Sequence, residues 1–387
     1  MLDHGLIDRD RLVDRLVEAV RIPSVNPFDG DSGQDTGEAR MAEWLTGQLD
    51  RLGYSVETQV PVPGRPNVWG TSPGGDAGVL ALVAHLDTVG VANCDDPFSG
   101  AVRDGRVHGR GACDMKAALA AYLEVAEVVR ESGRALAGRL MIVGLADEEF
   151  AMTGSAAFGS SGPAVDHAIV GEPTDLGICT SHLGQYAFPI RTFGRAVHSS
   201  IAEKGVNAID HMAQVIAVIA AWRDDLASAE PHPRCGHGRV MAGVIRGGDM
   251  VSIVPDRCEL EVDRRLLPGE TSHEVRADLA RRLDAVADTV ADFTYEIGDP
   301  IVDAAPLATP SASPLVAAAQ AVAGDRGLPT AVASFPAATD APNLGVPAVV
   351  WGPGALAQAH SVDEYVEIDQ LVEAAHLYLA VVEQLLG

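Results

Sequence analysis

Basic residues are scarce in this sequence. Its 387 residues include 28 lysines and arginines against 54 aspartates and glutamates, so the formal charge is −26 with histidine neutral. A surface this acidic repels phosphate backbones and anionic lipid head groups, so we expect neither a nucleic acid nor a membrane as a partner. The 47% apolar and 21% charged fractions are those of an ordered globular chain, and its length favours about two domains.

Cysteines and long apolar runs are also rare. The five cysteines form no CxxC pair, which is typical of reduced thiols in a cytoplasm rather than of a disulfide framework. The longest apolar stretches, such as residues 212–222, fall short of the roughly 18 residues that a membrane span requires. Residues 1–20 alternate charge with apolar side chains at helical spacing. We therefore expect an amphipathic N-terminal helix, not a signal peptide, and a cytoplasmic protein.

Short β-branched runs alternate with helical segments in the first and last parts of the chain. The helical stretch at 115–130 lies between such runs, which are residues 79–84, 140–145, 167–170 and 346–351. This alternation predicts an α/β domain with a mixed, largely parallel sheet flanked by helices.

The segment from 183 to 297 has a different pattern. Its expected order is strand, helix, two strands, helix and strand, the βαββαβ arrangement of a ferredoxin-like domain. The α/β pattern resumes near residue 298. We therefore expect a catalytic domain formed by residues 1–182 and 298–387, with a lid domain of residues 183–297 inserted into it.

Side chains that commonly bind metal ions follow the predicted strands. His85 and Asp87 follow the first strand, Glu148 and Glu149 the second, and Glu172 the third. Open α/β sheets place their sites at the carboxyl ends of the strands, so we expect these side chains to meet. The ordinary alternatives are a hydrogen-bonded histidine at a strand end and a solvated acidic turn.

Two further candidates lie in or after glycine-rich segments. Asp114 stands in GRGACDMK just before a predicted helix, where an isolated aspartate is usually an N-cap, and His360 follows the last strand by a glycine-rich loop. Two histidines and several carboxylates, without a cysteine, suit zinc, with cobalt or manganese as alternatives. One carboxylate shared by two ions would explain why the acids outnumber the histidines.

A series of ordered motifs resembles the zinc-dependent aminoacylase and acetylornithine deacetylase family, which also includes succinyl-diaminopimelate desuccinylase and glutamate carboxypeptidase. The motifs are ALVAHLDTV, DPFSGAVRDGRVHGRGACDMK, ADEEFAMTGS, VGEPTD, GRAVHSS, VPDRCELEVDRRLLPGE, TDAPNLG and WGPGALAQAHSVDEYV. They follow the family order from about residue 80 to 370. The resemblance implies a di-zinc exopeptidase-like fold and two divalent ions per chain.

The resemblance also implies the metal ligands, residue by residue. His85 and Glu172 would bind one zinc, Glu149 and His360 would bind the other, and Asp114 would bridge both. The family has a non-proline cis peptide bond after its bridging aspartate, so we expect one after Asp114.

Catalytic roles follow from the same resemblance. Glu148 would be the general base that takes a proton from the attacking water and passes it to the leaving amine. Asp87 would orient His85. His198, in GRAVHSS, would reach across a dimer to stabilise the tetrahedral oxyanion, so we expect a homodimer that pairs through the lid domain.

Three residues are candidates for substrate binding. Arg265 matches a family arginine that holds a substrate carboxylate. Asn207 is a further candidate for contact with the substrate. Ser252 stands where family members usually carry an asparagine, and its hydroxyl is shorter than a carboxamide. This departure puts an oxyanion or substrate contact at that position in doubt.

These inferences predict a metal-dependent hydrolase that cleaves the amide bond of an N-acyl amino acid. The alternatives are a small-peptide exopeptidase of the dipeptidase or glutamate carboxypeptidase type, or an N-carbamoyl amino acid hydrolase. A non-catalytic metal-binding protein is disfavoured because both Glu148 and Asp114 are present.

Three other patterns are set aside. GPGALA satisfies a loose dinucleotide fingerprint but lacks the following βαβ unit. PHPRCGHG offers two histidines and a cysteine without a fourth ligand, which favours a surface loop. Cys113 adjoins the carboxylate of Asp114, which would raise the pKa of the thiol and make it a poor nucleophile.

Overall fold

The computed structural model describes residues 2–28 and 37–387. The chain separates into two units. The first comprises Met1–Thr180, Thr309–Phe335 and Thr339–Gly387, and the second comprises Ser181–Ala308 with Pro336–Ala338. None of the helices in the described ranges combines the length and apolarity that a bilayer-spanning segment needs.

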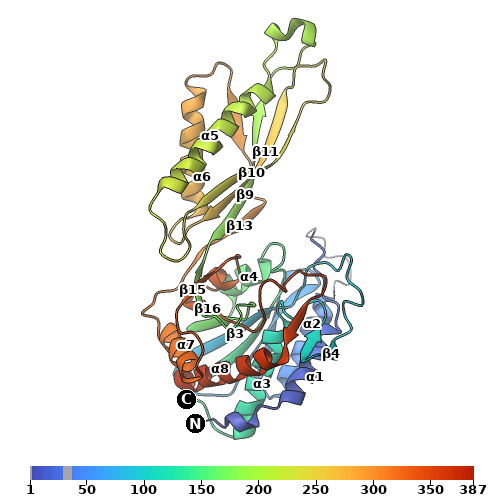
Figure 1. The fold of residues 1–387 in the computed structure, drawn as a ribbon, viewed down its shortest axis with the longest axis vertical. Helices are drawn as coiled ribbons and strands as arrows, with labels where there is room; N and C mark the ends of the chain where they lie inside the picture. Colours follow the sequence, from blue (N-terminus) through green and yellow to red (C-terminus); the bar gives the residue numbers. More distant parts are fainter. Residues whose placement is uncertain (1, 29–36) are drawn as a thin grey trace. The chain divides into compact units, whose positions relative to one another are not determined.

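A mixed sheet forms the centre of the first unit (Figure 1). Its strand order is β1 (Ser55–Val62), β2 (Arg65–Thr71), β6 (Arg139–Leu145), β3 (Val79–His85), β7 (His167–Val170), β16 (Ala348–Val350) and β8 (Cys179–His182), with β15 (Ala333–Phe335) beside β8. The four central strands, from β6 to β16, are parallel, and their outer neighbours are antiparallel. The predicted mixed, largely parallel sheet is confirmed.

Helices cover both faces of this sheet. On β2, the ring of Trp69 packs edge-on against Phe158 of α4 (Thr153–Ser161). The next residue, Gly70, faces Leu49 of α2 (Glu38–Arg51) so closely that a Cβ atom there would lie 3.0 Å from the leucine side chain. Neighbouring strand residues point to opposite faces, so α2 and α4 lie on opposite sides of the sheet.

The face with α2 carries the main core. Four more helices contribute to it: α1 (Arg9–Val20), α3 (Lys116–Ser132), α7 (Pro314–Asp325) and α8 (Ile368–Leu386). The rings of Tyr122 in α3 and Tyr378 in α8 lie 5.0 Å apart, and most of α3 is buried. Short 3-10 helices η1 (His4–Leu6) and η3 (Ala341–Leu344) complete the unit. Continuous apolar strands are typical of a sheet covered on both faces, which fits β3 and β6.

A small second sheet lies at the edge of the first unit. Its strands are β4 (Ala101–Arg103), β5 (Arg106–His108) and β17 (Tyr365–Glu367), in the order β17-β5-β4. β17 leads directly into α8, so this sheet joins the segment before α3 to the segment before α8.

The second unit follows the predicted βαββαβ order. Its elements are β9 (Gly184–Phe193), η2 (Ser199–Lys204), α5 (Ala208–Ser228), β10 (Arg239–Gly247), β11 (Arg257–Leu266), α6 (Ser272–Ala287) and β12 (Thr294–Ile297). The antiparallel sheet order is β10-β11-β9-β12. Residues of α5 and α6 pack on one face of it.

The chain leaves the second unit later than the sequence boundary at 297. After β12, β13 (Val302–Ala304) pairs with β9, and β14 (Leu307–Ala308) pairs with the end of β8. β13 thus adds backbone hydrogen bonds to the sheet of the second unit, and β14 adds them to the mixed sheet that contains β8. Their length is too small to give a recognisable apolar pattern.

Candidate active site

His85 ends the central strand β3 with its side chain 1% exposed. Its Nε2 atom lies 3.1 Å from Oδ1 of Asp114. Its Nδ1 atom lies 3.0 Å from the backbone oxygen of Asp87 and 3.5 Å from the carboxylate of that residue. A proton on Nδ1 satisfies the Asp87 backbone oxygen and leaves the lone pair of Nε2 directed at Asp114, which is the tautomer that a metal-binding histidine needs.

Asp114 lies between two histidines. Its Oδ2 atom is 3.3 Å from Nε2 of His360, while Oδ1 contacts His85. Met115, not Asp114, occupies the N-cap position of α3, and no side-chain cap is formed there. The ordinary N-cap role therefore does not describe Asp114. The peptide bond from Asp114 to Met115 is cis, as the family resemblance implies.

Glu149 and His360 complete one side of the cluster. Nε2 of His360 lies 3.1 Å from Oε2 of Glu149, and about half of the His360 side chain is exposed. Within the described part of the chain, Oε1 of Glu149 is buried and has no hydrogen-bond partner. A buried carboxylate oxygen without a partner is costly, so this atom is available for a cation.

Glu148 and Glu172 lie on the other side. One ligand atom from each, with one from His85, falls within a mutual distance of 4.8 Å, and the same holds for His85, Asp114 and Glu149. Oε1 of Glu172 is a second buried oxygen without a partner among the described residues. The six predicted residues thus come together from segments that are far apart in the sequence.

Negative charge exceeds positive charge in this cluster. Burial raises the pKa of Glu148 well above its ordinary value, and the charge of Glu172 adds to the effect. Burial and the charge of Asp114 do the same to the pKa of Glu172. Hydrogen bonds to Asp114 and Glu149 raise the pKa of His360 to about 10. A bound cation would relieve this repulsion, so the donor set fits divalent metal ions.

Asp87 connects the two halves of the site. Its Oδ1 atom accepts the backbone N–H of Glu148 at 3.2 Å, and its Oδ2 atom accepts that of Glu149 at 3.1 Å. Oδ2 also accepts Nδ2 of Asn26 at 2.8 Å. Burial alone would raise the pKa of Asp87. Its contacts with His85, Asn26 and the backbone N–H of Glu149 together outweigh burial and lower the pKa, so Asp87 stays charged.

A buried network behind Asp87 is not evident from the sequence. The amide of Asn26 also donates to Asp147 at 3.0 Å, and the guanidinium of Arg65 donates to Asp147 at 2.7 Å and to Glu38. Arg65 is 1% exposed. Arg65 is identified as part of the site by its burial between the carboxylates of Glu38 and Asp147. A sequence does not show which arginine is buried. Asp340 in TDAPNLG is also buried, which raises its pKa to about 7.

The sequence model described as peptidase family M20/M25/M40 matches residues 81–384. The chain belongs to this family. It is 32% identical over 364 residues to an acetylornithine deacetylase of Edwardsiella ictaluri, which covers 91% of this chain and 92% of the relative. The predicted family resemblance is confirmed, and the protein is an enzyme of the peptidase and amidohydrolase class.

Solved structures agree on the fold of this M20 chain. A tripeptidase from Staphylococcus aureus has a TM-score of 0.79 at 22% identity, over 98% of this chain and 99% of that one. A hydantoinase/carbamoylase family amidase from Burkholderia multivorans has a TM-score of 0.64 at 17% identity, over 98% of each chain. At sequence identities this low, the likeness shows a shared fold and does not show a shared substrate.

The other predicted site residues of this M20 chain lie in the second unit. Nδ1 of the exposed His198 accepts the backbone N–H of Ser200 at 3.2 Å, so the neutral ring carries its proton on Nε2. Ser252 donates no side-chain hydrogen bond among those found in the described chain, but its backbone oxygen accepts the N–H of Ser199. The side-chain oxygen of Asn207 caps helix α5.

Arg265 points away from the core of the second unit. Its neighbour Arg264 is 1% exposed and pairs with Glu270, whereas Arg265 contacts both carboxylate oxygens of Asp263 at 2.9 and 3.3 Å. The two arginines therefore lie on opposite faces of β11. A substrate carboxylate would have to compete with Asp263 for the Arg265 guanidinium.

Proposed function

We propose that this M20 enzyme hydrolyses the amide bond of an N-acyl amino acid, with an N-acetylated diamino acid such as N-acetylornithine as the first candidate. The observation that carries the proposal is the position of Asp114 between His85 and His360, next to two buried carboxylates with unpartnered oxygens. The relatives named acetylornithine deacetylase, at about 32% identity along most of the chain, support the deacylase class.

We assign two divalent metal ions to the cluster, with zinc as the first candidate and cobalt or manganese as alternatives. His85 and Glu172 would hold one ion, Glu149 and His360 the other, and Asp114 both. The unpartnered oxygens of Glu149 and Glu172 support this assignment. When bound, the ions would supply a Lewis acid that polarises the scissile carbonyl and lowers the pKa of a water molecule.

Glu148 is assigned as the general base. A carboxylate oxygen of Glu148 lies within 4.8 Å of ligand atoms of His85 and Glu172. The ligand set that the family resemblance implies does not include Glu148, which leaves its carboxylate to act on water. Burial of the Glu148 carboxylate disfavours its charged form and so favours uptake of a proton from water. The carboxylate would take one proton from the attacking water and deliver it to the nitrogen of the leaving amine. The products are then a carboxylate and a free amino acid.

We retain the roles that the family resemblance implies for residues of the second unit. His198 would donate Nε2–H to the oxyanion, which its contact with Ser200 supports. Arg265 would bind the α-carboxylate of the substrate by two parallel hydrogen bonds. Asn207 and Ser252 remain substrate-binding candidates, and for Asn207 only the amide nitrogen is left for that role because its oxygen caps α5.

The edge of the second unit supports a homodimer. β10 pairs on one side with β11, and its other edge has no strand partner in the described chain. This edge exposes apolar side chains, including Met241 at 60% and Ile245 at 52%. Unpaired backbone groups beside exposed apolar side chains favour pairing with another strand. We propose β10 of a second copy as that strand, because a two-fold pairing of identical edges is closed.

We also retain the cytoplasm as the proposed compartment. None of the five cysteines forms a disulfide, and Cys113, Cys179 and Cys258 are buried. Burial and the charges of Glu364 and Asp114 raise the pKa of the Cys113 thiol, which favours a packed thiol over a nucleophile.

A hydrolysis screen of the metal-loaded enzyme tests the proposed function. N-acetyl, N-succinyl and N-carbamoyl derivatives of one amino acid would be compared with a dipeptide, and the released amine measured. We expect the N-acetyl compound to be the best substrate. Preferred cleavage of the dipeptide or of the N-carbamoyl compound would replace the deacylase assignment with one of the two alternatives.

A further inference from the structure

The turn before Asp114 is held by a carboxylate from the far end of the chain. Glu364 is 3% exposed, and its Oε1 atom accepts two consecutive backbone N–H groups, from Cys113 at 2.8 Å and from Asp114 at 3.0 Å. In return, the backbone N–H of Gly109 donates to the backbone oxygen of Glu364 at 2.9 Å. These contacts fix both the start and the end of the turn.

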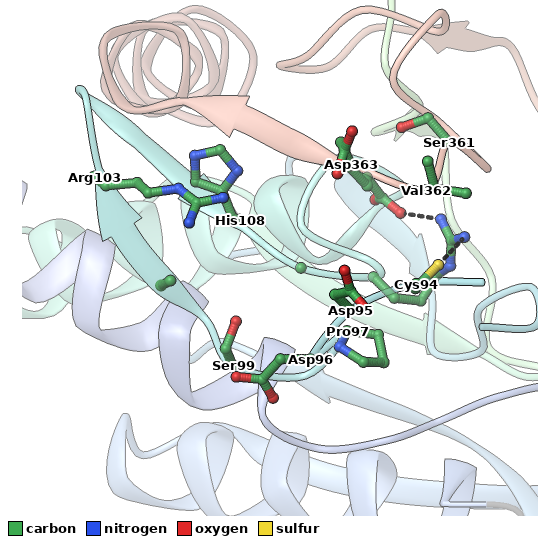
Figure 2. Close-up of a pocket in the computed structure, with 14 residues that line it drawn as sticks. Cys94, Asp95, Asp96, Pro97, Ser99, Arg103, His108, Ser361, Val362 and Asp363 are labelled. Atoms are coloured by element: carbon green, nitrogen blue, oxygen red, sulfur yellow. Dashed lines mark hydrogen bonds and ion pairs between the residues drawn. The ribbon is translucent and has the colours of Figure 1, made fainter. Parts of the chain in front are cut away.

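Arg110 holds the other oxygen of this carboxylate. The buried guanidinium contacts Oε2 of Glu364 through one amino group, and its Nε atom donates to the backbone oxygen of Gly90 at 3.2 Å. The side chains of Arg110 and Glu364 line a cavity of about 390 Å³. Cys94 and Asp363 also line this cavity, as Figure 2 shows. The carboxylate is therefore fixed by one ion pair and two backbone donors.

Glu364 also stands four residues after His360. The same short segment thus carries one proposed ligand and contacts the backbone of another, Asp114. Oδ2 of Asp114 lies 3.3 Å from Nε2 of His360. A displacement of the turn that Glu364 holds would therefore change this distance. Metal affinity is sensitive to displacements of this kind because ligand geometry is demanding.

We propose that Glu364, anchored by Arg110, is a positioning residue that sets Asp114 relative to His360 for metal binding. The inference rests on the metal centre of the proposed function but not on the identity of its substrate. Glu364 does not contact the reacting atoms. Its role is to hold the backbone N–H of Asp114, so that the carboxylate faces both histidines.

Variants of this pair can be compared with a matched ion pair close by. Glu364→Ala removes the acceptor, whereas Glu364→Gln keeps an oxygen for the two N–H groups and loses the charge. Arg110→Met removes the anchor. The control is Glu367→Ala, three residues further on, because Glu367 pairs with Arg106 at 2.7 Å on neighbouring strands and is 40% exposed.

Cobalt affinity of metal-free protein, measured by competition with a chelating indicator, is the first readout. We expect Glu364→Ala to weaken cobalt binding at least 10-fold, Glu364→Gln and Arg110→Met to weaken it less, and Glu367→Ala to change it less than 2-fold. The visible spectrum of bound cobalt should also change in Glu364→Ala. The double variant Arg110→Met/Glu364→Gln should lose little more cobalt affinity than the weaker-binding single variant, because the two residues act as one unit.

A cobalt affinity of folded Glu364→Ala equal to that of Glu367→Ala would overturn the proposal. If Glu364→Ala fails to fold, the cobalt affinities of Glu364→Gln and Arg110→Met test the proposal instead. Wild-type cobalt affinity in both variants would also overturn the proposal. Wild-type protein that binds no cobalt would contradict the proposed metal centre itself. Since no substrate is used, a wrong substrate assignment does not affect the result.

Discussion

Asp87 accepts the backbone N–H of Glu148 at 3.2 Å, so the residue that faces the proposed ligand His85 also holds the proposed general base. Its second carboxylate oxygen does the same for Glu149. One buried side chain therefore fixes the turn that follows β6 against the end of β3. The backbone oxygen of Asp87, rather than its carboxylate, is the nearer partner of the His85 ring.

Replacing Asp87 tests this double role. Asp87→Ala leaves two partly buried N–H groups without an acceptor, which costs about 2–3 kcal/mol of stability, and we expect turnover to fall about 100-fold. Asp87→Asn keeps the shape but turns an NH2 group toward one of these donors, so its effects should be intermediate. Urea unfolding and steady-state kinetics measure the two quantities. Asp76→Asn, an exposed carboxylate elsewhere, is the control. Full turnover in Asp87→Ala would rule out a positioning role.

Most of the fold could be predicted from local patterns in the sequence. The apolar runs of β3 and β6 are continuous because both faces of the sheet are covered, and this pattern needs no knowledge of distant contacts. The same apolar run predicts that His85 lies at the end of a strand, because the run stops at that residue. The short strands β13 and β14 were missed because two or three residues give no periodicity.

The buried partners of the site could not be predicted in the same way. Arg65 and Asn26 are far from Asp147 in the sequence and meet it only after the sheet has formed. An arginine on a strand is ordinarily solvated, so nothing local distinguishes Arg65. The same holds for Glu364, whose contact with the Asp114 turn joins segments about 250 residues apart in the chain.

Mixed dimers test the predicted role of His198. If His198 acts in the site of the partner, chains carrying His198→Ala and chains carrying Glu148→Gln are each inactive alone but form one intact site when mixed. Random pairing makes about half of the dimers mixed, and each mixed dimer holds one intact site of two. We therefore expect about a quarter of wild-type activity per total chain after subunit exchange. Activity of the mixture and exchange of differently tagged chains are measured together. No recovery despite exchange would favour a histidine that acts within its own chain.

Substitution of Arg265 tests the predicted carboxylate clamp. An ammonium cannot reproduce the two parallel hydrogen bonds of a guanidinium, so Arg265→Lys should lower kcat/KM nearly as much as Arg265→Ala, by about 10- to 100-fold. The loss should appear with free-acid substrates and shrink with their amides. Equal losses on both kinds of substrate would mean that Arg265, through its contact with Asp263, supports the fold instead.

His182 gives a pH dependence of stability that is independent of the metal site. Burial lowers the pKa of His182 to about 4, from an ordinary value of 6.5. The folded protein keeps the ring neutral, while the unfolded chain takes up a proton below pH 6.5. Stability is thus fully present above pH 6.5 and is lost as the pH falls toward 4, by up to about 3 kcal/mol.

Urea unfolding of wild type and His182→Gln at several pH values measures this effect. The wild type should lose about 2 kcal/mol more than the variant between pH 7.5 and 4.5, since the glutamine does not titrate. His273→Gln, at an exposed position on α6, is the control and should follow the wild type. Parallel curves for wild type and His182→Gln would show that His182 is not the group responsible.

Turnover and bound metal, measured together on Glu148→Gln and Glu149→Ala, test most directly whether a glutamate base acts at a metal centre. Glutamine keeps the shape of Glu148 but cannot take the proton of water, so we predict that Glu148→Gln retains its metal and loses about 100-fold or more in turnover. Glu149→Ala should lose metal as well as activity. Equal metal loss in the two variants, or wild-type turnover in Glu148→Gln, would contradict the assignment of Glu148 as the base.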